Sequence, residues 1–130
     1  PLIPKGAADY LVTFELLETM RKLEYLAPEG LVIANRDRIA PAPVLTGEMA
    51  YPSDLEQWIE KNIPRHLIVD TEGALKEAGT KKALNIVMLG ILSKYLPFDL
   101  DLWEKTISAT VKEKFIEHNL KAFSLGRALA

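Results

Sequence analysis

The run Leu31-Val32-Ile33-Ala34-Asn35 carries the clearest structural signal in the chain. Its four adjacent apolar residues are typical of a strand that is buried on both faces of a parallel sheet. Two similar runs lie before and after it, one from Ala8 to Phe14 and one from His66 to Asp70. The sequence therefore predicts three buried strands.

Helical patterns separate these three runs. From Glu15 to Leu26 apolar residues recur at helical spacing, and Pro28 and Gly30 predict the end of this helix. Before the third run, Ser53-Asp54-Leu55-Glu56 is a capping box that predicts a helix to about Asn62. Strand, helix, strand, helix, strand is the order of a parallel βαβαβ sheet with right-handed crossovers.

After Asp70 the pattern is helical throughout. Phe98 and Trp103 are placed as a hydrophobic staple at the start of the third helix of this half. The predicted helices run from Thr71 to Ala78 before Gly79, from Lys81 to Leu96, from Asp99 to about Lys114, and from Ile116 to Ala130. The predicted fold class is thus α/β, a doubly wound, Rossmann-like parallel sheet followed by a helical C-terminal half, in a single domain over residues 1–130.

The predicted sheet is incomplete. Three parallel strands leave two open edges, which have to be paired or covered. The chain also begins Pro1-Leu2-Ile3-Pro4, without an initiator methionine. We therefore expect a domain that is incomplete at its N-terminus, whose missing strands or a partner protein cover the edges.

The composition excludes several classes of function. The chain has no cysteine, is 48% hydrophobic and 26% charged, and carries a formal net charge of −2. Without cysteine it cannot form disulfides, thiolate nucleophiles or thiolate-ligated iron–sulfur clusters. The charge gives no general attraction to nucleic acid, and the longest apolar run, Ile86 to Leu92, is far shorter than the ~20 residues that span a bilayer. We expect a cytoplasmic protein.

The connection from Arg36 to Pro52 is long for a compact domain and rich in proline and apolar residues. Apolar side chains on such a connection are costly to leave in water, so they are expected to pack against protein. Two interpretations stay open: the connection covers this domain's own sheet, or it forms a subunit interface.

The carboxyl ends of the strands are the usual place for ligands in an open parallel sheet. Here they carry Glu15, the segment Asn35-Arg36-Asp37-Arg38, and Asp70-Thr71-Glu72. Arg36 and Arg38 are able to clamp a phosphate or carboxylate. The alternative is that Asp70 and Thr71 cap the next helix and the arginines are solvated, and the absence of a glycine-rich phosphate cradle favours it.

No residue is predicted to be catalytic or to bind a metal or cofactor. His66 begins a strand at the edge opposite the usual crevice, and His118 lies in the amphipathic last helix. Neither has a second histidine or a suitably spaced carboxylate nearby. The serines and threonines do not form a nucleophile elbow.

The segment from Lys82 to Leu92 is apolar nearly all round, so the sequence predicts a buried helix. Asn85 is its only polar residue in the middle and has to find hydrogen-bond partners. Gly90 costs about 1 kcal/mol relative to alanine in a helix and is expected to permit close approach of another backbone. A structural role for both is favoured over a role in partner contact.

Several of these segments resemble the gamma-type domain of 2-oxoacid:ferredoxin oxidoreductases. The proline-rich connection looks closest to the beta subunit of indolepyruvate ferredoxin oxidoreductase. The family's glycine-rich strand–turn–helix at the N-terminus is absent from this chain. The resemblance rests on Ala8 to Glu15, Val32 to Asn35, Pro41 to Gly47, Asn85 to Gly90 and Asn119 to Phe123.

This resemblance implies an accessory subunit that is not catalytic alone. In the family, partner subunits bind thiamine diphosphate and iron–sulfur clusters. Together the subunits convert a 2-oxoacid such as indolepyruvate or pyruvate to an acyl-CoA and reduce ferredoxin. This reaction belongs to anaerobic metabolism. A homodimer is a further option. The candidate subunit contacts are Arg38, Pro41, Pro43, Leu45, Thr46, Gly47, Asn85 and Gly90.

Two other functions stay open on the sequence. A stand-alone nucleotide- or cofactor-binding module would need a glycine-rich turn in a longer native chain, and dinucleotide binding would favour it. A homo-oligomeric interaction domain would fit the apolar connection and the last helix. Sizing the protein with and without a partner subunit separates this last function from the accessory subunit.

Overall fold

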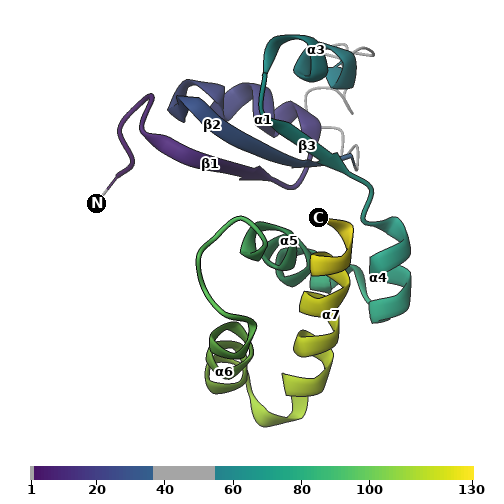
Figure 1. Ribbon diagram of the computed structural model, residues 1–130. Helices are drawn as coiled ribbons and strands as arrows, with labels where there is room; N and C mark the ends of the chain where they lie inside the picture. The colour runs from purple at the N-terminus through teal and green to yellow at the C-terminus, as the bar shows by residue number, and fades with distance from the viewer. Residues whose placement is uncertain (1, 37–54) are drawn as a thin grey trace. The chain divides into compact units, whose positions relative to one another are not determined.

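The computed structural model describes residues 2–36 and 55–130. The chain forms two compact units, Pro1–Asp70 and Thr71–Ala130, whose elements are labelled in Figure 1. Residues 37–52 of the predicted proline-rich connection and the first two residues of the predicted capping box, Ser53 and Asp54, lie outside the described residues.

The first unit contains a parallel sheet of three strands (Figure 1). The strands are β1 (Ala8–Thr13), β2 (Leu26–Asn35) and β3 (His66–Val69), and their order in the sheet is β1-β2-β3. Pairs such as Thr13 with Ala34 and Ala34 with Ile68 fix the register. The predicted α/β fold class is confirmed, since helices connect these strands and the C-terminal half is helical.

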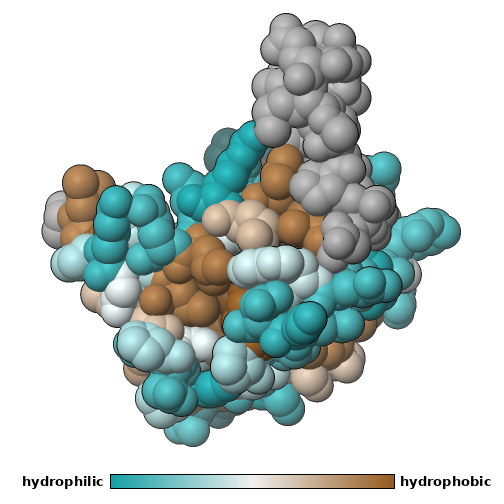
Figure 2. Space-filling view, turned by 90° about the horizontal axis from the view of Figure 1, so that it is seen from above, coloured by the Kyte–Doolittle hydropathy of each residue, from teal (hydrophilic) through white to brown (hydrophobic). Residues whose placement is uncertain are grey.

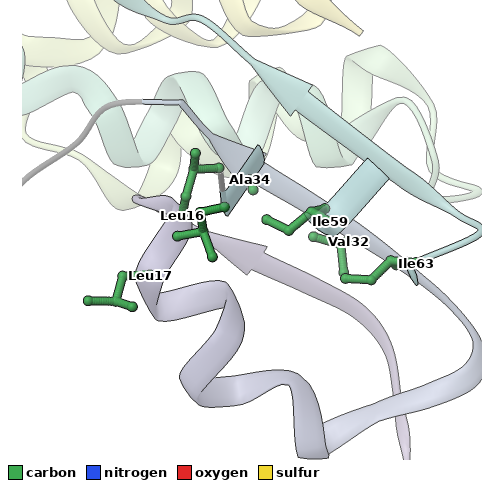
Figure 3. Packing of buried hydrophobic residues seen from close by; sticks show 7 residues of the cluster. Leu16, Leu17, Val32, Ala34, Ile59 and Ile63 are labelled. Carbon is green, nitrogen blue, oxygen red and sulfur yellow. The ribbon is translucent and has the colours of Figure 1, made fainter. Parts of the chain in front are cut away.

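Two helices pack against one face of this sheet. They are α1 (Leu16–Lys22), which is followed by the 3-10 turn η1 (Leu23–Tyr25), and α3 (Leu55–Asn62). Figure 3 shows Val32 and Ala34 of β2 beside Ile59 of α3, with Ile63 just beyond that helix. The buried cluster on this face consists of Leu16, Leu17, Val32, Ala34, Leu55, Ile59 and Ile63.

The prediction that Pro28 and Gly30 end the first helix is wrong. That helix is already complete at Lys22, and both residues lie inside β2. Ala8 pairs with Leu26 whereas Tyr10 pairs with Leu31, so the register shifts here and β2 holds more residues than β1 between the two pairs. A Cβ atom on Gly30 would lie 2.9 Å from the Ala8 carbonyl oxygen, which explains why glycine occupies this position.

The second unit is helical. Gly79 adopts a left-handed conformation with φ of 83° and ends the first helix, as predicted. The described elements are α4 (Glu72–Ala78), the 3-10 turn η2 (Lys81–Ala83), α5 (Leu84–Ser93), α6 (Leu100–Thr110), the 3-10 turn η3 (Glu113–Phe115) and α7 (Ile116–Leu129).

Two of these helices are shorter than predicted. The helix expected from Lys81 begins at Leu84, because the hydroxyl of Thr80 accepts a hydrogen bond from Lys82 N and caps a 3-10 turn first. The helix expected to reach Lys114 ends at Thr110, and Val111 is already extended.

The helices α5 and α7 approach each other through glycine. A Cβ atom on Gly90 would collide with the carbonyl oxygen of Phe123, and one on Gly126 would collide with the carbonyl oxygen of Val87. Both obstacles are backbone atoms, which cannot rotate away as a side chain can. The predicted close backbone approach at Gly90 is therefore confirmed, and Gly126 supplies the matching surface. The same unit buries Ala74, Ala78, Val87 and Ala122 in one apolar cluster.

Aromatic rings pack at the start of α6 and between α6 and α7. The rings of Phe98 and Trp103 meet edge to face with their centroids 6.0 Å apart, so the predicted hydrophobic staple is confirmed. The ring centroid of Trp103 also lies 5.7 Å from that of Phe123 in α7. Asp99 occupies the N-cap position, as predicted, and its carbonyl oxygen accepts from the backbone N–H groups of Leu102 and Trp103.

The surface mixes apolar and hydrophilic areas. Figure 2 shows brown, apolar atoms in the centre of the viewed face with teal, hydrophilic side chains around them. In the described part of the chain, no helix has the length and apolar character required to cross a membrane. The large apolar side chains exposed in the described part of the first unit are Leu2, Ile3, Phe14 and Trp58.

Candidate functional site

The carboxyl end of β1 carries a carboxylate that is used within the fold. Glu15 is buried and occupies the N-cap position of α1. Its two carboxylate oxygens accept hydrogen bonds from Leu17 N at 3.0 Å and from Glu18 N at 2.7 Å. These bonds satisfy two backbone N–H groups that have no partner within the helix. Glu15 therefore acts as a helix cap.

Buried polar side chains join the neighbouring strand ends. Asn35 is fully buried, and its Nδ2 donates to the carbonyl oxygen of Phe14 at 3.3 Å. The hydroxyls of Thr13 and Thr19 lie 2.6 Å apart in the interior. Buried polar groups of this kind have to be paired. They fix the end of β1 against β2 and α1, a role of the two threonines that the sequence did not predict.

Arg36 forms a bidentate ion pair with Glu56. Its Nε lies 3.2 Å and 3.1 Å from the two carboxylate oxygens of Glu56, and Nη2 lies 2.8 Å from Oε1. The hydrogen bond to Glu56 is the main cause that raises the pKa of Arg36 above its ordinary value. An anion clamp would have to compete with this carboxylate. The opposite charges of Arg36 and Glu56, at the two ends of the connection, could have predicted this ion pair from the sequence. The sequence pattern assigns Glu56 a role only in the capping box.

Of the other members of the predicted strand-end group, Asp70 also contributes, by attraction of opposite charge, to the raised pKa of Arg36. Arg38 lies outside the described residues. Thr71 is buried at the N-cap position of α4, where its carbonyl oxygen accepts from Leu75 N at 2.9 Å. Thr71 thus occupies the position that the capping alternative expected, but its side chain makes no capping hydrogen bond to α4.

The two predicted contact residues of α5 have different environments. Asn85 is the second residue of α5 and is exposed, and its Oδ1 lies 2.9 Å from Ile86 N, which donates to it. The prediction of a buried mid-helix asparagine is wrong, because the helix begins only at Leu84. Gly90 is buried, and α7 occupies the space beside it. The structure thus leaves Asn85 open to solvent and gives Gly90 a packing role.

The remaining predicted contact residues cannot be placed. They belong to the proline-rich connection and lie outside the described residues: Arg38, Pro41, Pro43, Leu45, Thr46 and Gly47. Their role in subunit contact stays a prediction.

The histidines are placed as the sequence indicated. His66 is the first residue of β3, and its Nδ1 lies 2.6 Å from the carbonyl oxygen of Ile63, which accepts from it. His118 is exposed on α7. Within residues 2–36 and 55–130, no three histidine or carboxylate side chains lie close enough together to hold a metal ion.

An apolar hollow lies on the second unit beside α6. It is lined by Phe98, Leu102, Trp103 and Thr106. Leu102 is 53% exposed and Phe98 50%. The Thr106 hydroxyl donates to the Leu102 carbonyl oxygen at 2.7 Å, so it is already used within the helix. The buried Trp103 Nε1 has no hydrogen-bond partner in the described part of the chain.

Comparison with known proteins adds a family match. The family model described as "Pyruvate ferredoxin/flavodoxin oxidoreductase" matches residues 1–129. The match therefore includes both compact units.

Curated relatives agree with this match. A protein from Archaeoglobus fulgidus named "Indolepyruvate oxidoreductase subunit IorB" is 36% identical over 131 residues, which cover 97% of this chain and 65% of the relative. A protein of the same name from Pyrococcus horikoshii is 32% identical over 130 residues, which cover 96% of this chain and 64% of the relative. The chain thus spans just under two thirds of the length of these relatives.

Proposed function

The chain belongs to the pyruvate ferredoxin/flavodoxin oxidoreductase family, and we propose that it acts as an accessory, gamma-type component of a 2-oxoacid ferredoxin oxidoreductase. The observation that carries the proposal is the match to the family over residues 1–129, together with relatives that are named as an oxidoreductase subunit. Because the match is continuous, we propose that both compact units belong to one domain of this type.

The proposed reaction belongs to the assembly as a whole. Thiamine diphosphate on a partner subunit supplies the chemistry that decarboxylates the 2-oxoacid, the acyl group passes to coenzyme A, and two electrons pass through iron–sulfur clusters to ferredoxin. These 130 residues contain no cysteine, so the cluster thiolates have to come from outside them. The carboxylate and arginine that were candidates for ligand binding, Glu15 and Arg36, are used in a helix cap and an ion pair. This chain is therefore proposed to shape the assembly without holding its cofactors.

The names of the relatives support indolepyruvate as the substrate class, with pyruvate as the alternative. We propose that the segment from Arg38 to Gly47 and the exposed Asn85 of α5 contact the thiamine-binding subunit. The exposed apolar residues Phe98 and Leu102 support a homodimer as a further contact of the same chain. We propose a cytoplasmic location and a role in anaerobic metabolism, as the family resemblance implies.

Reconstitution tests this function. The protein in its native length and the thiamine-binding subunit from the same source are purified separately and then mixed with thiamine diphosphate, coenzyme A and ferredoxin. Ferredoxin reduction is followed under anaerobic conditions with indolepyruvate and, in parallel, with pyruvate. We expect turnover only in the mixture, with the higher kcat/KM for indolepyruvate.

Two controls make the result decisive. The partner is assayed alone, and this protein is assayed alone with every cofactor present. Turnover by this protein without the partner, or equal turnover by the partner without this protein, would contradict the accessory role. A higher kcat/KM for pyruvate would keep the role but change the substrate class.

A further inference from the structure

One side of α6 is apolar and exposed. Phe98, Leu102 and Thr106 follow one another at intervals of four residues, and all three line the hollow beside this helix. Phe98 is 50% and Leu102 53% exposed, whereas Ile107 of the same helix is buried. Ala109, three residues after Thr106, is exposed and continues this side. We call Phe98, Leu102, Thr106 and Ala109 the α6 stripe.

The threonine hydroxyls at this stripe donate to the helix itself. The hydroxyl of Thr106 donates to the carbonyl oxygen of Leu102 at 2.7 Å. The hydroxyl of the neighbouring Thr110 donates in the same way to the carbonyl oxygen of Thr106 at 2.6 Å. Because each hydroxyl proton is used within the helix, the side chain offers mainly its methyl group to a neighbour. The stripe therefore suits an apolar protein surface better than a polar ligand.

The side chains of the stripe become smaller along the helix. Phe98 and Leu102 are large and lie at the beginning of α6, whereas Thr106 and Ala109 are small and lie towards its end. If two copies of α6 pair in an antiparallel manner, the large residues of each copy meet the small residues of the other. A parallel pair would set large against large. Close packing favours the antiparallel pair.

The charges beside the stripe favour the same arrangement. Asp101 and Lys105 are exposed, lie four residues apart and follow one side of the stripe. With a rise of about 1.5 Å per residue, two antiparallel helices that cross level with Trp103 place Asp101 of each copy beside Lys105 of the other. A parallel pair would place like charges together. Within the described part of the chain, neither Asp101 nor Lys105 forms an ion pair.

We propose that α6 is the contact surface between two copies of this chain, which pair in an antiparallel manner through the α6 stripe. The occupant is a second copy because the sizes and the charges are complementary to themselves, as a twofold interface requires. This inference rests on the homodimer named in the proposed function and gives it a surface and an orientation. A single helix face is small for a protein interface, so the dimer is expected to be weak, with a Kd on the order of 10–100 μM.

Sedimentation equilibrium on the protein alone tests the dimer. The native-length protein is studied over a range of concentrations, without any partner subunit, and compared with L102A. Leu102 is half exposed, so its truncation removes little packing within the chain. Each dimer contains this residue twice at the contact. We therefore expect L102A to associate with itself about tenfold or more weakly than the wild type.

A charge exchange tests the orientation. In an antiparallel pair, D101K sets lysine against lysine and K105D sets aspartate against aspartate, so each variant alone is expected to associate about fivefold or more weakly. An equimolar mixture of D101K and K105D brings opposite charges together again. The mixture is expected to associate more tightly than either variant alone. A parallel pair would show no such recovery.

The matched control is E104K, which makes the same kind of charge change on the opposite side of α6. Glu104 is two residues from Leu102 and therefore lies about 200° around the helix from it. E104K is expected to keep the wild-type Kd. The helix content of every variant is measured by circular dichroism, because Asp101 lies in the first turn of α6, where a negative charge stabilises a helix.

The outcomes separate this dimer from the accessory function. A wild-type protein that stays monomeric up to about 1 mM overturns the dimer. An unchanged Kd of L102A, or a mixture that associates no more tightly than its components, overturns it as well. If the wild type is monomeric and L102A binds the thiamine-binding subunit more weakly, the stripe belongs to that contact and the second copy is ruled out. The accessory function stands in each of these cases, because reconstitution with the partner subunit tests it separately.

Discussion

At the scale of single residues, the side chains that looked available for ligands are used within the fold. Glu15 caps α1 through two backbone N–H groups, and Arg36 pairs with Glu56. Asn35 joins the ends of two strands. These contacts give the polar groups partners inside the protein, which a buried polar group requires. In this protein Glu15, Arg36 and Asn35 therefore have structural roles.

The first prediction concerns the glycine contact between α5 and α7. G90A and G126A place a Cβ atom against the backbone carbonyl of Phe123 or Val87, so each is expected to destabilise the protein by about 1–3 kcal/mol. Urea unfolding followed by circular dichroism measures this change.

The control for this prediction is G73A in α4, where a Cβ atom meets nothing within 4 Å. Because alanine favours the helix over glycine, G73A is expected to stabilise the protein by about 0.5–1 kcal/mol. If G90A and G73A changed the free energy of unfolding in the same direction, the close approach would not be the reason for Gly90.

At the scale of elements, local sequence signals and tertiary contacts agree in most places. The staple of Phe98 and Trp103, the left-handed Gly79 and the three apolar runs all form as predicted. The main disagreement is β2, which starts at Leu26 and includes Pro28 and Gly30. An irregular stretch of a strand tolerates proline and glycine, whereas in the sequence alone these residues indicate the end of a helix.

The second prediction concerns the start of α6. F98A removes a ring that packs edge to face on Trp103, so it is expected to lower the free energy of unfolding by about 1 kcal/mol. Thermal unfolding monitored by circular dichroism measures this loss.

L2A is the matched control, because Leu2 is 96% exposed and has little packing to lose. It is expected to leave the melting temperature unchanged. Equal stability of F98A and L2A would show that the ring contact does not hold α6.

At the scale of the whole molecule, the chain has two compact units, with sheet edges and apolar side chains that other protein could cover. β1 and β3 are the outer strands of the described sheet, and apolar side chains such as Leu102 are exposed. Strand edges and exposed apolar surface favour association with further protein. The family match gives these features a context, since the relatives are named as subunits.

The third prediction concerns the cofactors of the assembly. Anaerobic incubation of these 130 residues with iron and sulfide is expected to give no visible absorption of a thiolate-ligated cluster, because the chain lacks cysteine. The thiamine-binding partner, treated in the same way, serves as the positive control. A stable cluster spectrum from this chain would contradict the division of cofactors that we propose.

The amino-acid sequence alone was sufficient to predict the order of strands and helices along the chain and the fold class. It also shows that the chain has no cysteine ligands. These features are local: apolar runs, helical spacing and residue types act over a few neighbouring positions. The family resemblance also rests on such short segments, and the match over residues 1–129 confirms it.

The tertiary structure alone decided how the polar residues are used. The partner of Arg36 is 20 residues away in the sequence, and Asn35 reaches Phe14 across 21. Whether a charged or amide side chain has a partner depends on such distant neighbours, which lie next to each other only in the folded chain. Gly30, Gly90 and Gly126 follow the same rule, since beside each of them lies a backbone carbonyl oxygen of another element.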